Sequence, residues 1–503
     1  MTGRLLLVAA GVHDLAGTRA LPRALLLQRD RIVWSGAEPA AAPPHERASD
    51  LGAAWITPAF VDAHVHATAT GLAASGVELA GARSAADLVA RVQRHAEQTH
   101  EPVIMGAGWD DFAWPEGRLP TAQELSRAAP GRVVHLTRVD AHSCLVDAGT
   151  LAQLPLADLA GVARTADGAP TGLLQEDAAQ AALAVTRAAL TARQLHAARR
   201  RACTDAAALG IGSLHEMGHP GMFGLDDALA WAHGSWPLDV LVWWAELDPT
   251  PPAPLRPGGD LFLDGSIGSG TAAVRVPYRD GGGTGTLFHA DDDVAAFFTE
   301  TTTHGRGAGV HAIGDRAVEQ AAGALEAAAR THGEEAVRAC RHRVEHLVLA
   351  TRTHVRRLAR LGAVASMQPA FDAAWGGPTG LYASRLGPKR SLTSNPFAWC
   401  AAEPAALAFS SDSTVTPLAP WGGVLAAEQH RGGLGITRTA AFAAHTVGGR
   451  FVACQDDVGP LAPGRRADLA VWDRDPLALE DPRDARCLAT IVRGQVVHGT
   501  LMT

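Results

Sequence analysis

The chain reads Pro58-Ala59-Phe60-Val61-Asp62-Ala63-His64-Val65-His66, and this stretch decides how the fold is interpreted. An apolar run that follows a proline predicts a β-strand, here one that ends in two histidines. Side chains alternate along a strand, so His64 and His66 point the same way, about 7 Å apart, and Val65 points the other way. Two imidazoles at that spacing can bind one metal ion. A bare His-x-His pair is more often structural, so the prediction depends on partners elsewhere.

Three further ligand-type residues end later strand-like segments. His311 lies in Val-His-Ala-Ile-Gly-Asp, His346 ends Arg-Val-Glu-His, and Asp412 ends Phe-Ser-Ser-Asp. Each alone has an ordinary interpretation: a core or capping histidine, a surface His–Glu pair, or a helix N-cap. Residues at the carboxyl ends of different strands of a barrel converge on one rim. Four histidines and one aspartate in such positions therefore predict a metal-dependent hydrolase site.

Strand-like and helical segments alternate between these residues, which is typical of a parallel βα fold. We predict an α/β (βα)8 TIM-type barrel over residues 58–446, with Gly/Pro-rich loops at 248–259, 277–285 and 372–396 as lids. Helices are expected at 85–98, from 192 to about 209, and at 315–330. The expected strands after the first are 133–138, 211–214, 261–263, 309–312, 343–346, 363–368 and 407–410.

The two ends of the chain predict a second, composite domain. Residues 1–57 contain short strand-like runs at 5–8, 24–28 and 31–35, too little to bury a core alone. The C-terminal part has similar runs at 468–472 and 489–497. We therefore expect residues 1–57 and 447–503 to form one small β-sandwich.

Composition narrows the class of partner. The chain of 503 residues is 47% hydrophobic and 19% charged, with a formal net charge of −8 and no Lys/Arg run. This composition favours a globular protein that acts on a small-molecule substrate. It does not favour nucleic acid or a membrane as a partner, and it is compatible with a homodimer. The six cysteines are scattered without paired spacing, which predicts reduced thiols in a cytoplasmic protein.

The order His-x-His, His, His, Asp resembles the metal-dependent amidohydrolase superfamily. The sequence around these residues is similar to that of one branch, amidohydrolase family 3, which contains N-substituted formamide deformylases and N-acyl amide hydrolases. The similar segments run from about residue 55 to 475 and are 108–110, 138–143, 170–174, 261–266, 311–317, 341–346, 411–412 and 463–469.

The resemblance implies roles for these residues. His64 and His66 would hold one metal with Asp412, and His311 and His346 would hold a second or act beside the first. Asp412 would take a proton from the attacking water and pass it to the leaving nitrogen. The chemistry agrees, because a divalent ion lowers the pKa of water to about 7 and polarises a carbonyl, and a carboxylate within reach can act as general base.

One position departs from the family pattern. Many members place a lysine just before the Leu-Phe-x-Asp-Gly segment, where its carbamylated form bridges two metals, but here the residue is Asp260. Three alternatives stay open: Asp260 ligates directly, Glu216 reaches across as the bridging carboxylate, or the site holds one metal. Asp260 could also be an ordinary loop residue, and Glu216 could support a ligating histidine.

Substrate contacts are less specific in the sequence. Trp109 and Asp110 could line the pocket, or Trp109 could pack in the core, and His142 could contact substrate or end a strand. We predict an enzyme that cleaves a non-peptide C–N bond, an amide or an N-formyl or N-acyl amine, with Asp412, His346 and His311 as catalytic residues. The expected cofactor is one or two divalent ions, zinc first, with iron, manganese, nickel or cobalt also suited, and no organic cofactor. The alternatives are a deaminase or cyclic-amide hydrolase, and a catalytically silent metal-binding barrel.

Overall fold

The computed structural model describes residues 3–16, 21–112, 114–139, 142–403 and 406–501 of the 503-residue chain. The chain divides into two compact units: residues 1–67 with 203–503, and residues 68–202. The sequence predicted one hydrolase barrel over 58–446, and residues 68–202 of that range form a compact unit of their own. None of the described helices is both long and apolar enough to cross a lipid bilayer.

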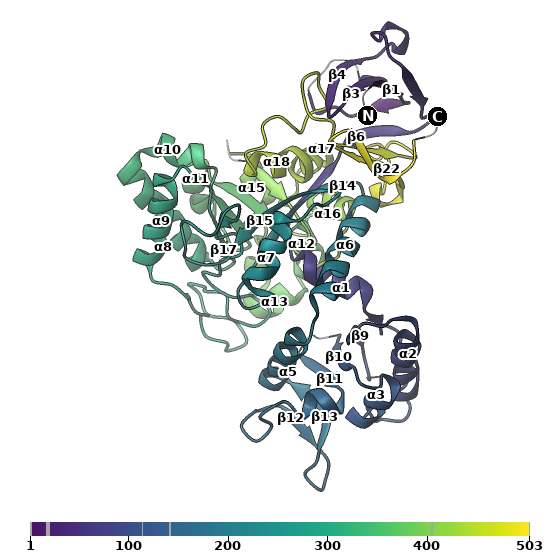
Figure 1. Ribbon diagram of the computed structural model, residues 1–503. Helices are drawn as coiled ribbons and strands as arrows, with labels where there is room; N and C mark the ends of the chain where they lie inside the picture. Colours follow the sequence, from purple (N-terminus) through teal and green to yellow (C-terminus); the bar gives the residue numbers. More distant parts are fainter. Residues whose placement is uncertain (1–2, 17–20, 113, 140–141, 404–405, 502–503) are drawn as a thin grey trace. The chain divides into compact units, whose positions relative to one another are not determined.

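Two parallel four-stranded sheets carry the ligand-type residues of the first unit (Figure 1). The first has the order β16-β15-β14-β7, made of Arg256–Pro257, Asp239–Trp244, Ile211–Gly218 and Phe60–Val65. The second has the order β17-β18-β19-β20, made of Gly309–Ala312, Arg343–His346, Val364–Met367 and Leu407–Phe409. All pairings within these sheets are parallel, so the carboxyl ends of neighbouring strands meet at one edge.

Segments outside the strands add hydrogen bonds at the edges of the two parallel sheets. Residues 261–263, which were predicted as a strand, form only an isolated parallel bridge to β17, from Phe262 to His311. The Leu263 N–H also donates to the His311 carbonyl at 3.1 Å. At the other end, the Asp412 N–H donates to the His64 carbonyl at 2.9 Å, which joins the chain after β20 to β7.

Helices connect and cover these strands. Figure 1 shows α8 to α11 together beside β17. The longest, α9, turns Ala317, Ala321 and Leu325 into the core at helical spacing. The helices of this unit are α7 (Gly224–His233), α8 (Asp291–Thr303), α9 (Asp315–His332), α10 (Glu334–Cys340), α11 (Arg352–Arg360), α12 (Pro369–Trp375), α13 (Leu381–Leu386), α14 (Pro388–Leu392), α15 (Phe397–Ala401), α16 (Pro420–Glu428), α17 (Arg438–Ala443), a π-helical turn (Ala444–Gly448) and α18 (Gly449–Val452).

Both ends of the chain contribute to one small β region of the first unit. A four-stranded sheet has the order β4-β3-β1-β5 (Arg31–Gly36, Ala24–Gln28, Arg4–Val8, Arg47–Asp50), and a five-stranded sheet has the order β2-β6-β21-β22-β23 (Gly11–Val12, Trp55–Pro58, Leu469–Trp472, Cys487–Val492, Gln495–Gly499). Residues of both sheets share one hydrophobic cluster, which includes Leu7, Leu25, Leu469 and Ile491. The predicted run 489–497 is interrupted by a turn, because Arg493 and Gly494 both have positive φ.

The second unit has its own six-stranded sheet with the order β12-β13-β11-β10-β9-β8 (Val162–Arg164, Pro170–Gln175, Ser143–Val146, Val133–Arg138, Val103–Trp109, Val77–Glu78). Its helices α2 (Ala85–Gln98), α3 (Ala122–Ala128), α4 (Ala148–Leu151) and α5 (Glu176–Ala188) pack against that sheet (Figure 1). Helices α1 (Ala67–Ser75) and α6 (Ala192–Ala208) begin and end the unit. The strand predicted at 133–138 is present as β10, but it belongs to this six-stranded sheet and not to the parallel sheets of the first unit.

Candidate metal centre

Strand β7 delivers the two histidines of the opening motif. All six residues of β7 are buried, and His64 and His66 are only 0% and 8% exposed. Their ring centroids lie 5.6 Å apart, so both rings face one side of the strand as the spacing predicts. Asp62, on the same strand, accepts the backbone N–H groups of His64 and Ser411, at 3.4 and 3.0 Å.

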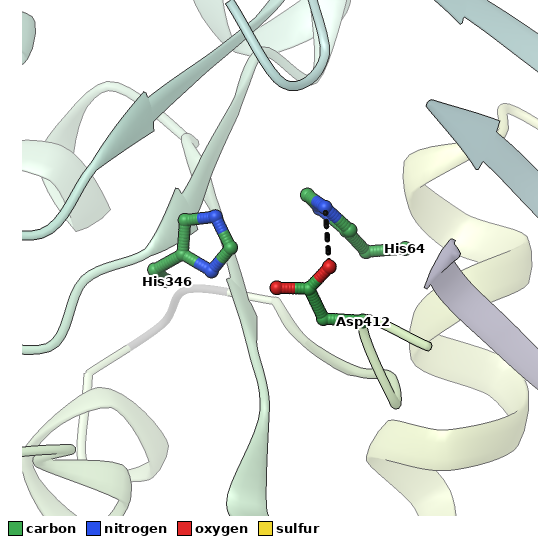
Figure 2. Close-up of side chains that lie close together, drawn as sticks. All are labelled: His64, His346 and Asp412. Carbon is green, nitrogen blue, oxygen red and sulfur yellow. Dashed lines mark ion pairs between the residues drawn. The ribbon is translucent and has the colours of Figure 1, made fainter. Parts of the chain in front are cut away.

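Asp412 lies between two of the histidines. Figure 2 shows its carboxylate between the rings of His64 and His346. The Asp412 Oδ1 atom is 3.5 Å from His64 Nε2 and 3.4 Å from His66 Nε2. Asp412 has a φ of 52°, in the left-handed region that only a few per cent of non-glycine residues adopt. Asp412 lies three residues beyond the end of β20, and its buried side chain faces the histidines at the end of β7.

Asp260 is the central carboxylate of the site. Its Oδ1 atom is 3.1 Å from His311 Nδ1, 3.3 Å from His346 Nε2 and 3.8 Å from His64 Nε2. Its Oδ2 atom is 3.5 Å from His66 Nε2. Asp260 is 3% exposed, which excludes the interpretation as an ordinary surface loop residue.

Two glycines bring Asp260 to this position. Gly258 and Gly259 have φ values of 71° and 84°, which L side chains rarely adopt. A Cβ atom on Gly258 would lie 2.0 Å from the Gly309 carbonyl oxygen, and one on Gly259 would lie 2.5 Å from the Trp243 Cβ. The backbone therefore passes close to β15 and β17 before Asp260 turns inward.

In the part of the chain that the structure describes, potential ligand atoms form three overlapping groups, each within 4.8 Å: His64, His346 and Asp412; His64, His66 and Asp260; and Asp260, His311 and His346. Asp260 belongs to one group with the β7 histidines and to another with the histidines of β17 and β18. His64 and His346 are each shared by two groups as well, so the three groups form one continuous cluster of candidate ligands.

Neighbouring groups fix the orientation of three of the histidine rings. The Nδ1 atom of His64 bonds to Glu345 Oε2 at 2.9 Å, that of His66 to the Met217 carbonyl at 3.2 Å, and that of His346 to Gln368 Oε1 at 2.7 Å. Each ring then presents Nε2 to the carboxylates. Hydrogen bonds of this kind fix the tautomer of metal-binding histidines.

Sequence reasoning missed Glu345 and Arg343 as parts of the site. Glu345 is fully buried, bonds to His64, and is paired with the buried Arg343. Burial raises the pKa of the Glu345 carboxyl, but Arg343 and His64 outweigh this effect and lower the pKa to about 2. Regular alternation would turn Glu345 and His346 to opposite faces. His346 has a φ of 71°, so the strand pattern ends there and both side chains face the site.

Replacing Glu345 by glutamine tests this support. Glu345→Gln keeps the shape but removes the charge that orients His64, so we expect metal affinity to fall about 10- to 100-fold. Competition with a chromogenic chelator measures the dissociation constant. The control is Glu326→Gln on α9, which removes a carboxylate from an ion pair with Arg357 of α11. Equal metal affinities for wild type and Glu345→Gln would show that the charge of Glu345 does not contribute to metal binding.

The charges around the histidines fit a bound cation. Burial lowers the pKa of His66 and of His346, but Asp412 and Asp260 together raise each to about 9. Burial raises the pKa of Asp260, yet the neighbouring histidines bring it well below its usual value. The two carboxylates therefore stabilise positive charge at this point, which is the environment that a bound cation requires.

Two buried atoms supply the sharper test of fit. Fourteen buried side-chain atoms of the described residues have no hydrogen-bond partner, and His64 Nε2 and Asp412 Oδ1 are the two that belong to the candidate ligands. They face each other at 3.5 Å, which is too long for a hydrogen bond and allows a cation to contact both. Imidazole nitrogens and carboxylate oxygens are suitable ligands for such an ion.

Glu216 has a different environment from Asp260. Its Oε2 atom accepts the Ala67 N–H at 2.5 Å, and within the described chain it is absent from the three ligand groups. Its neighbour His215 contacts Arg343 at 3.3 Å. Of the alternatives left open by the sequence, the geometry favours Asp260 as the central carboxylate and Glu216 as a support for the end of β7.

Trp109, Asp110 and His142, which were considered as substrate contacts, lie in the second unit. Trp109 is fully buried there, and its indole N–H donates to the Leu136 carbonyl at 3.0 Å, which favours the core-packing alternative. Asp110 pairs with Arg138 at 3.0 Å, and the exposed His142 lies 3.2 Å from Glu176.

Fold and site together define the class of metal-dependent hydrolases. The model of the amidohydrolase family matches residues 47–498, and the chain belongs to that family. It is 26% identical to amidohydrolase YtcJ of Bacillus subtilis (strain 168), over 90% of this chain and 91% of that protein. It is 23% identical to the N-substituted formamide deformylase of Arthrobacter pascens, over 97% of both chains.

A solved structure agrees with this assignment. The crystal structure of an uncharacterized metal-dependent hydrolase from Pyrococcus furiosus superposes with a TM-score of 0.78 and 25% identity, covering 94% of this chain and all of the other. The protein is therefore an enzyme that hydrolyses C–N bonds, and its relatives support a divalent metal as cofactor.

Proposed function

We propose that the enzyme hydrolyses an amide or an N-formyl or N-acyl amine by attack of water activated at the site around Asp260. The observation that carries this proposal is the pair of unsatisfied buried atoms, His64 Nε2 and Asp412 Oδ1, which face each other beside Asp260. The match to an N-substituted formamide deformylase supports the bond type.

The proposed architecture is a (βα)8 barrel with a composite β-sandwich. The order β7-β14-β15-β16 followed by β17-β18-β19-β20, with hydrogen bonds from residues 261–263 to β17 and from Asp412 to β7, is the order expected of a closed barrel. The shared hydrophobic cluster of the two sheets built from the chain ends supports the sandwich.

We assign two divalent cations, zinc first, to the ligand groups. His64 and His66 would hold one and His311 and His346 the other, with Asp260 between them in place of the lysine found in related sequences. Such a cation supplies Lewis acidity, which lowers the pKa of a bound water to about 7 and polarises the substrate carbonyl. Six free cysteines fit the cytoplasmic location that we include in the proposal.

The residues of the chain then carry the proton transfers. Asp412 accepts a proton from the attacking water while the water oxygen forms a bond to the carbonyl carbon. Asp412 then donates that proton to the amide nitrogen as the C–N bond breaks, which gives a carboxylic acid and an amine. Asp62 and the left-handed backbone at residue 412 hold the carboxylate against the end of β7.

A product screen tests the proposal. The metal-loaded full chain is incubated with N-formyl amines, N-acetyl amines, cyclic amides and amino-substituted heterocycles, and free amine, formate, acetate and ammonia are assayed separately. We expect amine and acid in equal amounts, and loss of both after chelation. Ammonia as the main product would instead identify a deaminase, and no product from any class would contradict the hydrolase proposal.

A further inference from the structure

A cavity of about 340 Å³ opens directly on the metal centre. One end is polar and is formed by His66, Asp260, His311, His346 and Asp412. This volume is at the lower end of the range for ligand pockets. It therefore suits a small amide whose carbonyl lies at the polar end and whose substituent extends into the remainder.

The remainder of the cavity is apolar and largely aromatic. Its walls include Phe262, Ile267, Ile313, Phe371, Trp375, Leu381, Tyr382 and Val415. Phe371 and Trp375 are four residues apart on α12, so they share one helix face. Their ring centroids are 5.0 Å apart, and Tyr382 lies 6.2 Å beyond Trp375. Phe371 is stacked on His346, with ring centroids 5.9 Å apart. The rings of Phe371, Trp375 and Tyr382 therefore form a row that begins at a candidate ligand histidine.

The entrance to the cavity is apolar as well. Phe262, Leu381 and Val415 are 37%, 40% and 51% exposed. They are large hydrophobic side chains that remain in contact with solvent. Exposed apolar side chains that surround a pocket are typical of ligand-binding surfaces. A neutral apolar substituent would cover them.

The described lining of the cavity contains no lysine or arginine. The nearby Arg385 is committed to other partners: it pairs with Asp280 and donates to the Ile267 and Gly268 carbonyls. Arg390 donates to the Val276 and Pro277 carbonyls at 2.7 and 2.9 Å. A carboxylate on a substituent that lies along the apolar wall would therefore have no lysine or arginine to pair with, which is costly.

We propose that the substrate is an amide whose larger substituent is a neutral aryl or arylalkyl group, bound against Phe371, Trp375 and Tyr382, and without a carboxylate next to the scissile bond. This inference rests on the proposed hydrolase function and specifies its substrate class. N-acyl amino acids are excluded as good substrates. Stacking on three rings gives the aromatic substituent its advantage over an alkyl group of similar size.

A matched pair of compounds tests the charge requirement. N-formylphenethylamine and N-formylphenylalanine differ only in the carboxylate, and their N-acetyl counterparts form a second pair. We expect kcat/KM to be about 100-fold higher for each neutral compound. Equal values, or a preference for the carboxylate, would overturn the proposal.

Binding separates this inference from the proposed function. Metal-loaded Asp412→Asn protein, which we expect to turn over slowly, is titrated with the same compounds in a calorimeter. Tighter binding of the neutral compounds supports the substrate class even if none is hydrolysed by the wild type, an outcome that would count against the function alone. Equal binding of charged and neutral compounds contradicts the substrate class whatever the activity.

Trp375→Ala tests the aromatic wall. We expect the dissociation constant of N-formylphenethylamine to rise about 10-fold and that of N-methylformamide to stay unchanged. Trp399→Ala is the matched control, because Trp399 on α15 stacks under Arg352 at 4.8 Å and does not line the cavity. Metal content and melting temperature confirm that each variant is folded. Equal losses for the large and the small amide would show that Trp375 supports the metal centre and not the substituent.

Discussion

Asp412→Asn is expected to lower kcat by about 10²- to 10⁴-fold while the protein remains folded. The substitution keeps the size of the side chain but removes the oxygen pair that accepts a proton from water and returns it to the leaving nitrogen. The carboxylate lies 3.4 and 3.5 Å from two histidine nitrogens and is buried, so no bulk solvent replaces it. The measurement is the steady-state rate on the best amide found in the screen, with metal content determined on the same sample.

The control for this variant is Asp292→Asn, which changes an exposed aspartate in the first turn of α8. Its rate should equal that of the wild type. Asp412→Asn with full metal content and a rate within threefold of wild type would refute the role as general base. Loss of metal together with activity would show that Asp412 acts mainly as a ligand, a distinction that the rate alone does not make.

The sequence predicts that the candidate ligands lie together, because their positions follow from strand geometry. His64, His66, His311 and His346 each lie at or next to the carboxyl end of a parallel strand, and Asp412 lies just beyond one. Parallel strands bring these ends to one edge, so a residue order read along the chain converts directly into a cluster. The observed bounds of β17 and β18 equal the predicted ranges 309–312 and 343–346. Each is a short run that ends at or next to a candidate ligand histidine.

Glu345 shows where this reasoning fails. Alternation along β18 assigns Glu345 and His346 to opposite faces, and the sequence contains no signal for the left-handed conformation of His346 that brings both inward. The sequence also contains no sign that residues 68–202 form a compact unit of their own, for a similar reason. Strands and helices alternate in that segment just as they do elsewhere, and the order of pairing, which places β10 beside β9 and β11, depends on long-range contacts that periodicity does not encode.

Asp260→Ala is expected to reduce the bound metal from two ions per chain to one or none. Asp260 contacts histidines of both halves of the site, with Oδ1 at 3.1 and 3.3 Å from His311 and His346 and Oδ2 at 3.5 Å from His66. If the site binds two cations as proposed, Asp260 would contribute a ligand to each, and its loss would weaken the binding of both. Elemental analysis of protein purified without chelator gives the stoichiometry.

Glu216→Gln is the matched comparison, because Glu216 is equally buried but bonds to the Ala67 backbone. The amide oxygen of glutamine can still accept that N–H, so this variant should keep both ions. The reverse result, with metal retained in Asp260→Ala and lost in Glu216→Gln, would make Glu216 the bridging carboxylate. One ion in the wild type and in Glu216→Gln would mean that Asp260 completes a mononuclear site, in which case Asp260→Ala should abolish metal binding and not merely halve it.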